Sequence, residues 1–300
     1  MPQSLVRNIE PDEIAGLPRN LQEWTSGFIE QPGTKTVLSS SAFDTKGCFV
    51  AENKGSIVGC IAVTSLPHKN WLVVRYLVAQ RALSRVDSVE KLLSRALEYL
   101  ESRKPEFFRA TTPSMQPYVD VYKSFGFKPI RRDFRISWDL TEKQDSPRGR
   151  VEIKEVTEKT IEETARVFVR SIRPYWDWRT EEQGGEDAVA ENFCKGLKKG
   201  ERWLSGSIGN EVVALTGLIP DYYKSGEARF RGTFVVPEYR GRGIGRAMMN
   251  EGLDWAKKMG QRRMKVYTFS YMECLAPGAL LYMQSGGRIE SEYLQMQRAS

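Results

Sequence analysis

The chain divides into segments in which apolar residues recur at every second position and segments in which they recur at every third or fourth position. The first spacing is typical of half-buried strands and the second of amphipathic helices. In the C-terminal half this pattern predicts, in order, a strand, two helices, a hairpin, a strand, a helix, a strand, a helix and a strand: 151–156, 157–171, 187–200, 202–219, 228–236, 245–260, 262–270, 278–285 and 288–297. Thr157 is the expected N-cap of the first helix, and the hairpin should turn near Gly209–Asn210.

The N-terminal half follows a similar order. A hairpin is predicted first, then a strand, a helix, a strand, a helix and a closing strand: 48–65, 71–79, 88–102, 107–112, 117–127 and 130–140. The segments VYKSFGF (Val121–Phe127) and LYMQSGG (Leu281–Gly287) both place a glycine four residues after a tyrosine. Mixed strands and helices in the same order twice predict a duplicated α/β domain.

Between the halves, DLTEKQDSPRGR (Asp139–Arg150) interrupts the apolar pattern with charge, serine, proline and glycine. Such a stretch is typical of a linker. We therefore predict one domain at 1–140, a linker at 141–150 and a second domain at 151–300.

Composition restricts the chemistry. The chain of 300 residues has 40% hydrophobic residues, a net charge of +7 and one histidine, His68, in an expected loop. Scattered cysteines without a CxxC pair favour reduced thiols over a zinc site. No apolar stretch is long enough for a membrane span or a signal peptide, and no basic tract points to nucleic acid. We expect a cytoplasmic protein without a metal, a membrane partner or a nucleic-acid partner.

The segment TFVVPEYRGRGIGRAMMNEGL, from Thr233 to Leu253, joins a predicted strand to a predicted helix through Gly241, Gly243 and Gly245. The first backbone N–H groups of a helix have no partner within it, and glycine lets an anion approach them closely. The segment is therefore predicted to cradle phosphate. A P-loop is excluded because GxxxxGK[ST] is absent, and the dinucleotide fingerprint fails because Arg246 takes the place of its last glycine.

Read from Arg240, the string RGRGIG has the form [RQ]-x-x-G-x-[GA]. With VVPEY before it, this segment resembles the acetyl-CoA pyrophosphate loop of the GCN5-related N-acetyltransferase (GNAT) superfamily. The resemblance covers most of residues 150–300 in the order of elements. It implies an α/β fold of two tandem GNAT-like domains, each a mixed, mostly antiparallel sheet flanked by helices. It also implies acetyl-CoA as co-substrate, held by Phe234, Val235, Val236, Arg240, Gly241, Arg242, Gly243, Ile244, Gly245 and Arg246.

The family's general acid is a tyrosine in a late helix, and Tyr282 matches it, with Gly286 as the motif's glycine. Leu275 and Gly287 depart from the family pattern, which has asparagine and phenylalanine there. For the general base, Glu227 and Asp221 are candidates, as is a chain of waters that needs no single carboxylate. Gly232 inside the strand 228–236 is expected either to mark a bulge that opens a notch for pantetheine or to serve packing alone.

The acceptor site is expected in the segment 170–187. Tyr175, Trp176 and Trp178 would pack an apolar stem, although aromatics at helical spacing can equally be core. Asp177, Glu181 or Glu182 would attract an ammonium, whereas Arg173 and Arg179 would instead bind an acceptor carboxylate. In the first half, Ser84, Asp87 and Val89 stand where the second half has Arg240, Gly243 and Gly245. We therefore expect residues 1–140 to be a degenerate GNAT-like domain without a cofactor loop.

The sequence thus predicts an N-acetyltransferase, a monomer or homodimer, that moves acetyl from acetyl-CoA to a primary amine, expected to be a small molecule, by direct attack in a ternary complex. Two alternatives stay open at this point: a protein lysine or N-terminal acetyltransferase, and a CoA-binding regulatory module without turnover.

Overall fold

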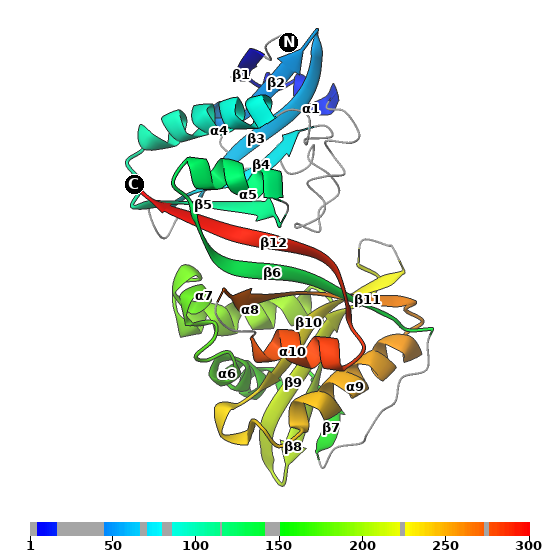
Figure 1. The fold of residues 1–300 in the computed structure, drawn as a ribbon. Helices are drawn as coiled ribbons and strands as arrows, with labels where there is room; N and C mark the ends of the chain where they lie inside the picture. Colours follow the sequence, from blue (N-terminus) through cyan, green and yellow to red (C-terminus); the bar gives the residue numbers. More distant parts are fainter. Residues whose placement is uncertain are drawn as a thin grey trace. The chain divides into compact units, whose positions relative to one another are not determined.

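The computed structural model (Figure 1) describes residues 5–16, 45–66, 71–79, 86–114, 116–141, 151–222, 226–272 and 276–300. The predictions that concern His68, Ser84 and Leu275 lie outside these residues, as do residues 142–150 of the expected linker. The chain forms two compact units: unit 1 is Met1–Asp133 with Ser291–Ser300, and unit 2 is Phe134–Glu290. The last ten residues thus belong to unit 1, whereas the sequence-based division ends the first domain at residue 140.

Unit 1 contains a mixed sheet in the strand order β1-β2-β3-β4-β5-β12. Neighbouring strands are antiparallel except for the parallel pair β4–β5. Its elements are β1 (Leu5–Asn8), α1 (Glu13–Gly16), η1 (Thr45–Gly47), β2 (Phe49–Asn53), β3 (Ser56–Leu66), β4 (Trp71–Ala79), α4 (Val86–Glu101), β5 (Phe107–Pro113), α5 (Gln116–Ser124) and the end of β12 (Arg288–Ala299).

Unit 2 repeats this plan in the order β7-β8-β9-β10-β11, with β6 beside β11. Again the first pairs are antiparallel and the last, β10–β11, is parallel. Its elements are β6 (Lys128–Asp139, from Phe134 on), β7 (Glu152–Glu155), α6 (Ile161–Ser171), α7 (Asp177–Glu182), α8 (Glu186–Lys198), β8 (Arg202–Ile208), β9 (Glu211–Ile219), β10 (Glu227–Val235), η4 (Pro237–Tyr239), α9 (Ile244–Lys258), β11 (Arg263–Tyr271) and α10 (Pro277–Gln284). The fold of two tandem units, each a mixed and mostly antiparallel sheet with helices, is as the sequence predicts.

In both units the two parallel strands pair over only part of their length. In unit 2, pairing covers Glu227–Phe230 with Arg263–Val266, although β10 and β11 run on to Val235 and Tyr271. Pairing between β4 and β5 likewise covers four residues of each strand. In each unit the fourth strand also carries a bulge against the third, at Arg231 in β10 and at Tyr76 in β4. The bulge predicted at Gly232 is thus confirmed. The extra residue is Arg231, one position before the glycine.

The repeated tyrosine–glycine spacing has a local cause. In α10, the N–H of Gly287 donates to Tyr282 O at 3.0 Å and that of Gly286 to Met283 O at 3.1 Å, with Gly286 at φ 82°. This is a Schellman motif, which requires a residue with a left-handed backbone four positions after the carbonyl that accepts the longer-range bond. Here that carbonyl belongs to Tyr282 and the left-handed residue is Gly286. In α5, Tyr122 and Gly126 end the helix in the same way.

Gly287 stands where the family pattern has phenylalanine, and the packing explains the difference. A Cβ on Gly287 would lie 2.5 Å from Ile136 Cγ2 and 2.7 Å from Tyr282 O. Trp138 of β6 fills the space instead, edge-on to Tyr282 at 5.9 Å between ring centroids, and donates from Nε1 to Ser285 O at 3.0 Å. In unit 1 the equivalent Phe127 itself packs on Tyr122 at 5.4 Å.

Two local predictions need correction. The N-cap of α6 is Thr160 rather than Thr157, because the helix begins at Ile161 and residues 157–160 form a turn. In that turn the N–H of Thr157 donates to Thr160 Oγ1 at 3.1 Å. The segment between the two predicted helices also contains a short helix, α7, where a loop was expected. No helix in the described ranges is long and apolar enough to cross a membrane.

Candidate active site

The glycine turn has the geometry of an anion cradle. Gly241 and Gly243 have φ values of 74° and 78°, which residues with a Cβ seldom adopt. A Cβ built on either glycine would meet no atom within 4 Å. In α9 the bond from Ala247 N–H to Gly243 O leaves the N–H groups of residues 244–246 without an acceptor inside the helix. These donors lie at the positive end of a helix of 15 residues.

Arg240 is a structural part of this turn. Its guanidinium donates to Val235 O at 3.0 Å, Ser171 O at 2.9 Å and Arg173 O at 2.6 Å, and lies 5.4 Å from the Tyr175 ring centroid. The group therefore ties the end of β10 to the C-terminal end of α6, where a cation is favourable. Burial lowers the Arg240 pKa from its ordinary value, and these acceptors use much of its donor capacity. Arg242 and Arg246, by contrast, each donate one hydrogen bond within the described residues, to Glu238 O and Gln284 Oε1.

A cleft of about 420 Å³, here called the loop cleft, opens from this turn within unit 2. It runs between the α6 end, the last residues of β10 and β11, and the start of α10. Its lining residues are Ser171, Ile172, Tyr175, Trp176, Thr233, Phe234, Val235, Tyr239, Arg240, Gly241, Ile244, Gly245, Thr268, Phe269, Ala276, Pro277, Gly278, Leu281 and Tyr282. The cleft therefore joins the glycine turn to the predicted acid.

Tyr282 is held in the floor of the loop cleft. Its side chain is buried, with 5% exposed, and packs edge-on to Trp138 and Phe230. The N–H of Thr233 donates to its hydroxyl oxygen at 3.1 Å. Burial raises the pKa of Tyr282 to about 12, against the opposing effect of that N–H. The phenol is thus protonated at neutral pH, and because its oxygen already accepts from Thr233, its own proton is free to be donated elsewhere.

The direction of the backbone donors in β10 follows from the same bond. Successive N–H groups of a strand point to opposite edges. Thr233 N–H points away from β9, because Tyr282 accepts it, and Val236 N–H points toward β9, because Val213 O accepts it at 3.0 Å. Val235 N–H therefore points into the gap where β10 and β11 part, whereas Phe234 N–H points toward β9.

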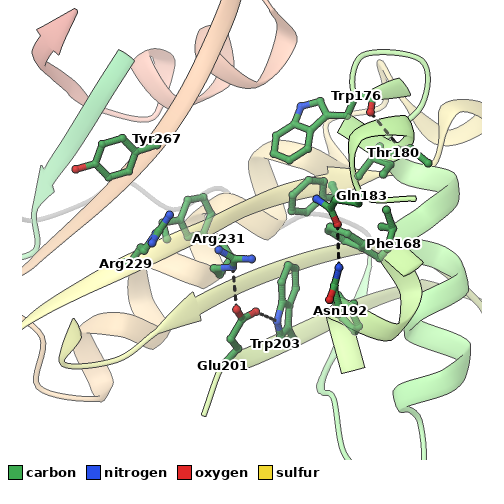
Figure 2. A pocket seen from close by; sticks show the side chains of 15 residues that line it. Phe168, Trp176, Thr180, Gln183, Asn192, Glu201, Trp203, Arg229, Arg231 and Tyr267 are labelled. Atoms are coloured by element: carbon green, nitrogen blue, oxygen red, sulfur yellow. Dashed lines mark hydrogen bonds and ion pairs between the residues drawn. The ribbon is translucent and has the colours of Figure 1, made fainter. Parts of the chain in front are cut away.

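A second cavity of about 130 Å³, here called the aromatic cavity, lies in the same unit (Figure 2). It is bordered by α6, α7, α8, β8, β10 and β11, and it shares Ile172, Trp176 and Phe234 with the loop cleft. The lining residues are Phe168, Ile172, Trp176, Thr180, Gln183, Val189, Asn192, Phe193, Glu201, Trp203, Arg229, Phe230, Arg231, Phe234 and Tyr267. The two cavities therefore meet at the parted end of β10.

The bulge in β10 decides which face of the sheet the side chains beyond it occupy. In a regular strand Phe230 and Phe234, four positions apart, would share one face. Here Phe230 packs on Tyr282 and Trp138, while Phe234 packs on Phe168 and Trp203 in the cluster under α6 and α8. The extra residue therefore moves the end of the strand from one face to the other.

Gly232 allows this geometry. Its φ is 126°, and a Cβ there would lie 2.9 Å from the Phe234 ring and 3.2 Å from the Tyr282 hydroxyl. Both readings of the glycine from the sequence thus apply, since it marks the bulge and permits close packing.

The predicted base candidates lie apart from both cavities. Glu227, at the start of β10, pairs with Arg263 at 3.2 Å and with Lys265 at 2.5 Å. Asp221 accepts from Gly226 N–H at 2.8 Å in a turn. Neither is among the described residues that line either cavity. A base role for them stays a prediction that this geometry does not favour.

The predicted acceptor residues are dispersed. Trp176 lines both cavities and packs on Phe234 and Phe269. Tyr175 lines only the loop cleft, and Asp177 begins α7, with Oδ1 3.9 Å from Arg173 Nε. The side chain of Trp178 lies outside the described residues. Of the predicted loop residues, Val236, Arg242, Gly243 and Arg246 are not among the described residues that line the loop cleft.

The charged residues of the aromatic cavity were not predicted. Arg229 and Arg231 stand two positions apart in ARFRG, and Glu201 precedes β8. The sequence feature that could have indicated the arginines is a charged residue at every second position of a strand that is expected to be covered on both faces. Among the described residues, no group of three or more metal-ligating side chains is present.

The raised pKa of Tyr282 predicts a pH-dependent contribution to stability. The folded protein keeps this proton up to about pH 12, whereas the unfolded chain releases it near pH 10. The advantage of wild type over Tyr282→Phe in free energy of unfolding should therefore be constant below pH 9 and shrink by roughly 1 kcal/mol per pH unit above pH 10. Urea unfolding of both proteins between pH 8 and 11.5 measures it; parallel curves would contradict the burial of the phenol.

Comparison with known proteins supports the resemblance found in the sequence. Residues 166–272 match the model of the Acetyltransferase (GNAT) family. A search of curated proteins finds no match.

Solved structures share the fold at low sequence identity. A GCN5-related N-acetyltransferase from Sphaerobacter thermophilus is 14% identical, with a TM-score of 0.69, covering 99% of this chain and 95% of its own. A tandem GNAT protein from the clavulanic acid biosynthesis pathway is 12% identical, with a TM-score of 0.66, covering 99% and 98%. A GNAT-family acetyltransferase from Colwellia psychrerythraea is 13% identical, with a TM-score of 0.56, covering 98% and 99%. Residues 166–272 thus form a domain of the GNAT acetyltransferase family, in a chain that has the fold of tandem GNAT proteins.

Proposed function

We propose that the protein transfers an acetyl group from acetyl-CoA to a primary amine of a small molecule, by direct attack of the amine in a ternary complex. The observation that carries this proposal is the continuity of the loop cleft, which leads from the unpaired N–H groups at the start of α9 to Tyr282. The residues fit the co-substrate, because Gly241 and Gly243 leave space where a phosphate must approach backbone.

The pyrophosphate would bind at the turn from Arg240 to Arg246, and the pantetheine arm would lie along the unpaired edge of β10. Val235 N–H then serves as the donor to the thioester carbonyl oxygen, where negative charge develops during attack. Because this donor belongs to a strand fixed by β9, it needs no rearrangement at the moment of reaction.

Tyr282 is proposed as the general acid. The reaction breaks the carbon–sulfur bond, and the departing sulfur takes the phenolic proton while the nitrogen forms the amide bond and loses a proton. The Thr233 N–H orients the hydroxyl by occupying one lone pair. For the proton on the incoming amine we propose a water path that starts at the junction of the two cavities, because the candidate carboxylates Glu227 and Asp221 are not among the described residues that line either cavity.

The acceptor is proposed to enter through the aromatic cavity. Its small volume suits part of a small molecule better than a protein segment. Residues 1–140 are proposed to be a domain without a cofactor loop. No glycine occurs between Gly59 and Gly126, and Asp87 and Val89 lie within the first turn of α4 rather than before it.

Substitution of Gly243 tests the co-substrate assignment. Gly243→Glu should abolish acetyl-CoA binding, because it adds a negative charge at the phosphate site and a side chain at φ 78°. Gly200→Glu is the matched control, since Gly200 has φ 96°, open space around it and a position at the end of α8. Calorimetric titration with acetyl-CoA should give wild-type affinity for the control alone. Undiminished affinity in Gly243→Glu would remove the assignment.

Substitution of the acid tests the mechanism separately. Tyr282→Phe should lower kcat roughly 100-fold, a value at the low end for general acids because a thiolate is already a good leaving group. The dissociation constant of acetyl-CoA should stay within about a factor of three of wild type, because the proton transfer contributes only after binding. Release of free CoA thiol with a panel of primary amines measures kcat. An unchanged kcat would mean that another group protonates the sulfur.

A further inference from the structure

The aromatic cavity has an uneven charge. Among the described residues that line it, the charged ones are Arg229, Arg231 and Glu201. Both arginines project from β10, Arg229 before the bulge and Arg231 at its extra position, and Glu201 lies opposite Arg231 (Figure 2). The remaining lining residues are aromatic, aliphatic or neutral polar. The cavity therefore carries a net positive charge at the end away from the loop cleft.

Glu201 is already engaged by the protein. Its Oε1 lies 3.2 Å from Arg231 Nε, and its Oε2 accepts from Trp203 Nε1 at 3.1 Å. The Glu201 side chain is 13% exposed. An incoming ammonium would have to compete with two existing partners of this carboxylate, so Glu201 is poorly suited to recognise the amine.

Glu201 pairs with Arg231, whereas Arg229 contacts tyrosines. Arg229 donates to the Tyr222 hydroxyl at 2.8 Å, and its guanidinium lies 5.2 Å and 5.6 Å from the ring centroids of Tyr222 and Tyr267. The pKa of Arg231 is lowered, first by burial and also by the charge of Arg229, although Glu201 opposes both effects. Two guanidinium groups close enough to repel each other favour an anion that contacts both.

The positions of Arg229 and Arg231 relative to the loop cleft determine where the two ends of a ligand would lie. The aromatic cavity meets the loop cleft at Ile172, Trp176 and Phe234. A molecule with an acidic group at the arginines would place its other end at this junction, beside the parted strands. Between the two ends the cavity is lined by Phe168, Phe193 and Trp203, whose rings pack on one another.

We propose that the acceptor is an amine that also carries a carboxylate or phosphate group, and that Arg229 and Arg231 bind this acidic group in the aromatic cavity. The inference rests on the proposed function, and Glu201 acts in it as a positioning residue for Arg231. Guanidinium suits both acids, because it can donate two parallel hydrogen bonds to either.

Matched pairs of probes test the proposal. β-Alanine is compared with β-alaninamide, and O-phosphoethanolamine with ethanolamine, so that each pair differs in the acidic group alone. Steady-state kinetics of CoA release give kcat/KM, and calorimetry in the presence of CoA gives affinity. In at least one pair the acidic member should be preferred roughly 10- to 100-fold, as expected for a lost charge-assisted hydrogen bond. The pair that shows the preference identifies carboxylate or phosphate.

Variants assign the preference to the cavity. Arg231→Gln and Arg229→Gln should each reduce the preference at least tenfold while acetyl-CoA still binds. Arg202→Gln, which removes an exposed arginine of β8, should leave it unchanged. Glu201→Gln should keep or increase the affinity for the acidic probe, because it removes the competing negative charge. Melting temperatures of all variants identify any loss of fold.

The outcomes separate the two proposals. If acetyl-CoA does not bind wild type, the proposed function fails. If it binds, but the neutral probes are equal or better, or no acidic probe binds, the acidic acceptor is wrong. A preference that persists in both arginine variants, or that Glu201→Gln abolishes, would also overturn it.

Discussion

The bulge in β10 is the constraint on which the candidate site depends. One extra residue at Arg231 ends the pairing of β10 with β11 after four residues and exchanges the faces of the strand beyond it. The exchange places Phe230 under Tyr282 and Phe234 under α6. It also leaves the N–H groups of Thr233 and Val235 unpaired with a neighbouring strand, and the first of them donates to Tyr282. A regular strand would close the junction at which the two cavities meet.

The tandem arrangement gives this interpretation an internal comparison. Both units have the parallel pair that parts after four residues, the bulge in the fourth strand and a tyrosine two residues before the last residue of the helix. Unit 1 retains these backbone features without a glycine between Gly59 and the start of α4. Tyr122 is fully buried there, and its hydroxyl has no hydrogen-bond partner among the described residues. The backbone plan therefore persists in unit 1 without the glycine turn of unit 2.

Most of the fold could be predicted from the sequence, because strands and helices follow local periodicity and both helix ends near Gly126 and Gly286 follow local backbone requirements. The glycine turn could equally be predicted, because three closely spaced glycines between a strand and a helix are seldom needed except where an anion approaches the backbone. Thr160 was missed as the cap because four polar residues in a row, from Thr157, offer competing starts.

The acceptor side could not be predicted in this way. Glu201, Arg229 and Trp203 come together only through the pairing of β8, β9 and β10. Strand alternation alone indicates that Arg229 and Arg231 share a face, but not which face. The bulge changes that alternation after Arg231, and a glycine in a strand does not specify where the extra residue lies. Such contacts depend on register, which single-sequence patterns do not fix.

The number of acetyl-CoA molecules bound per chain tests the central claim most directly. Calorimetric titration of the whole protein should give one site, because only unit 2 combines the parted strands with a glycine turn at the start of a helix. Two sites would contradict the proposal that unit 1 lacks cofactor binding. The absence of binding would contradict the account of the loop cleft and leave its glycine turn to another anion.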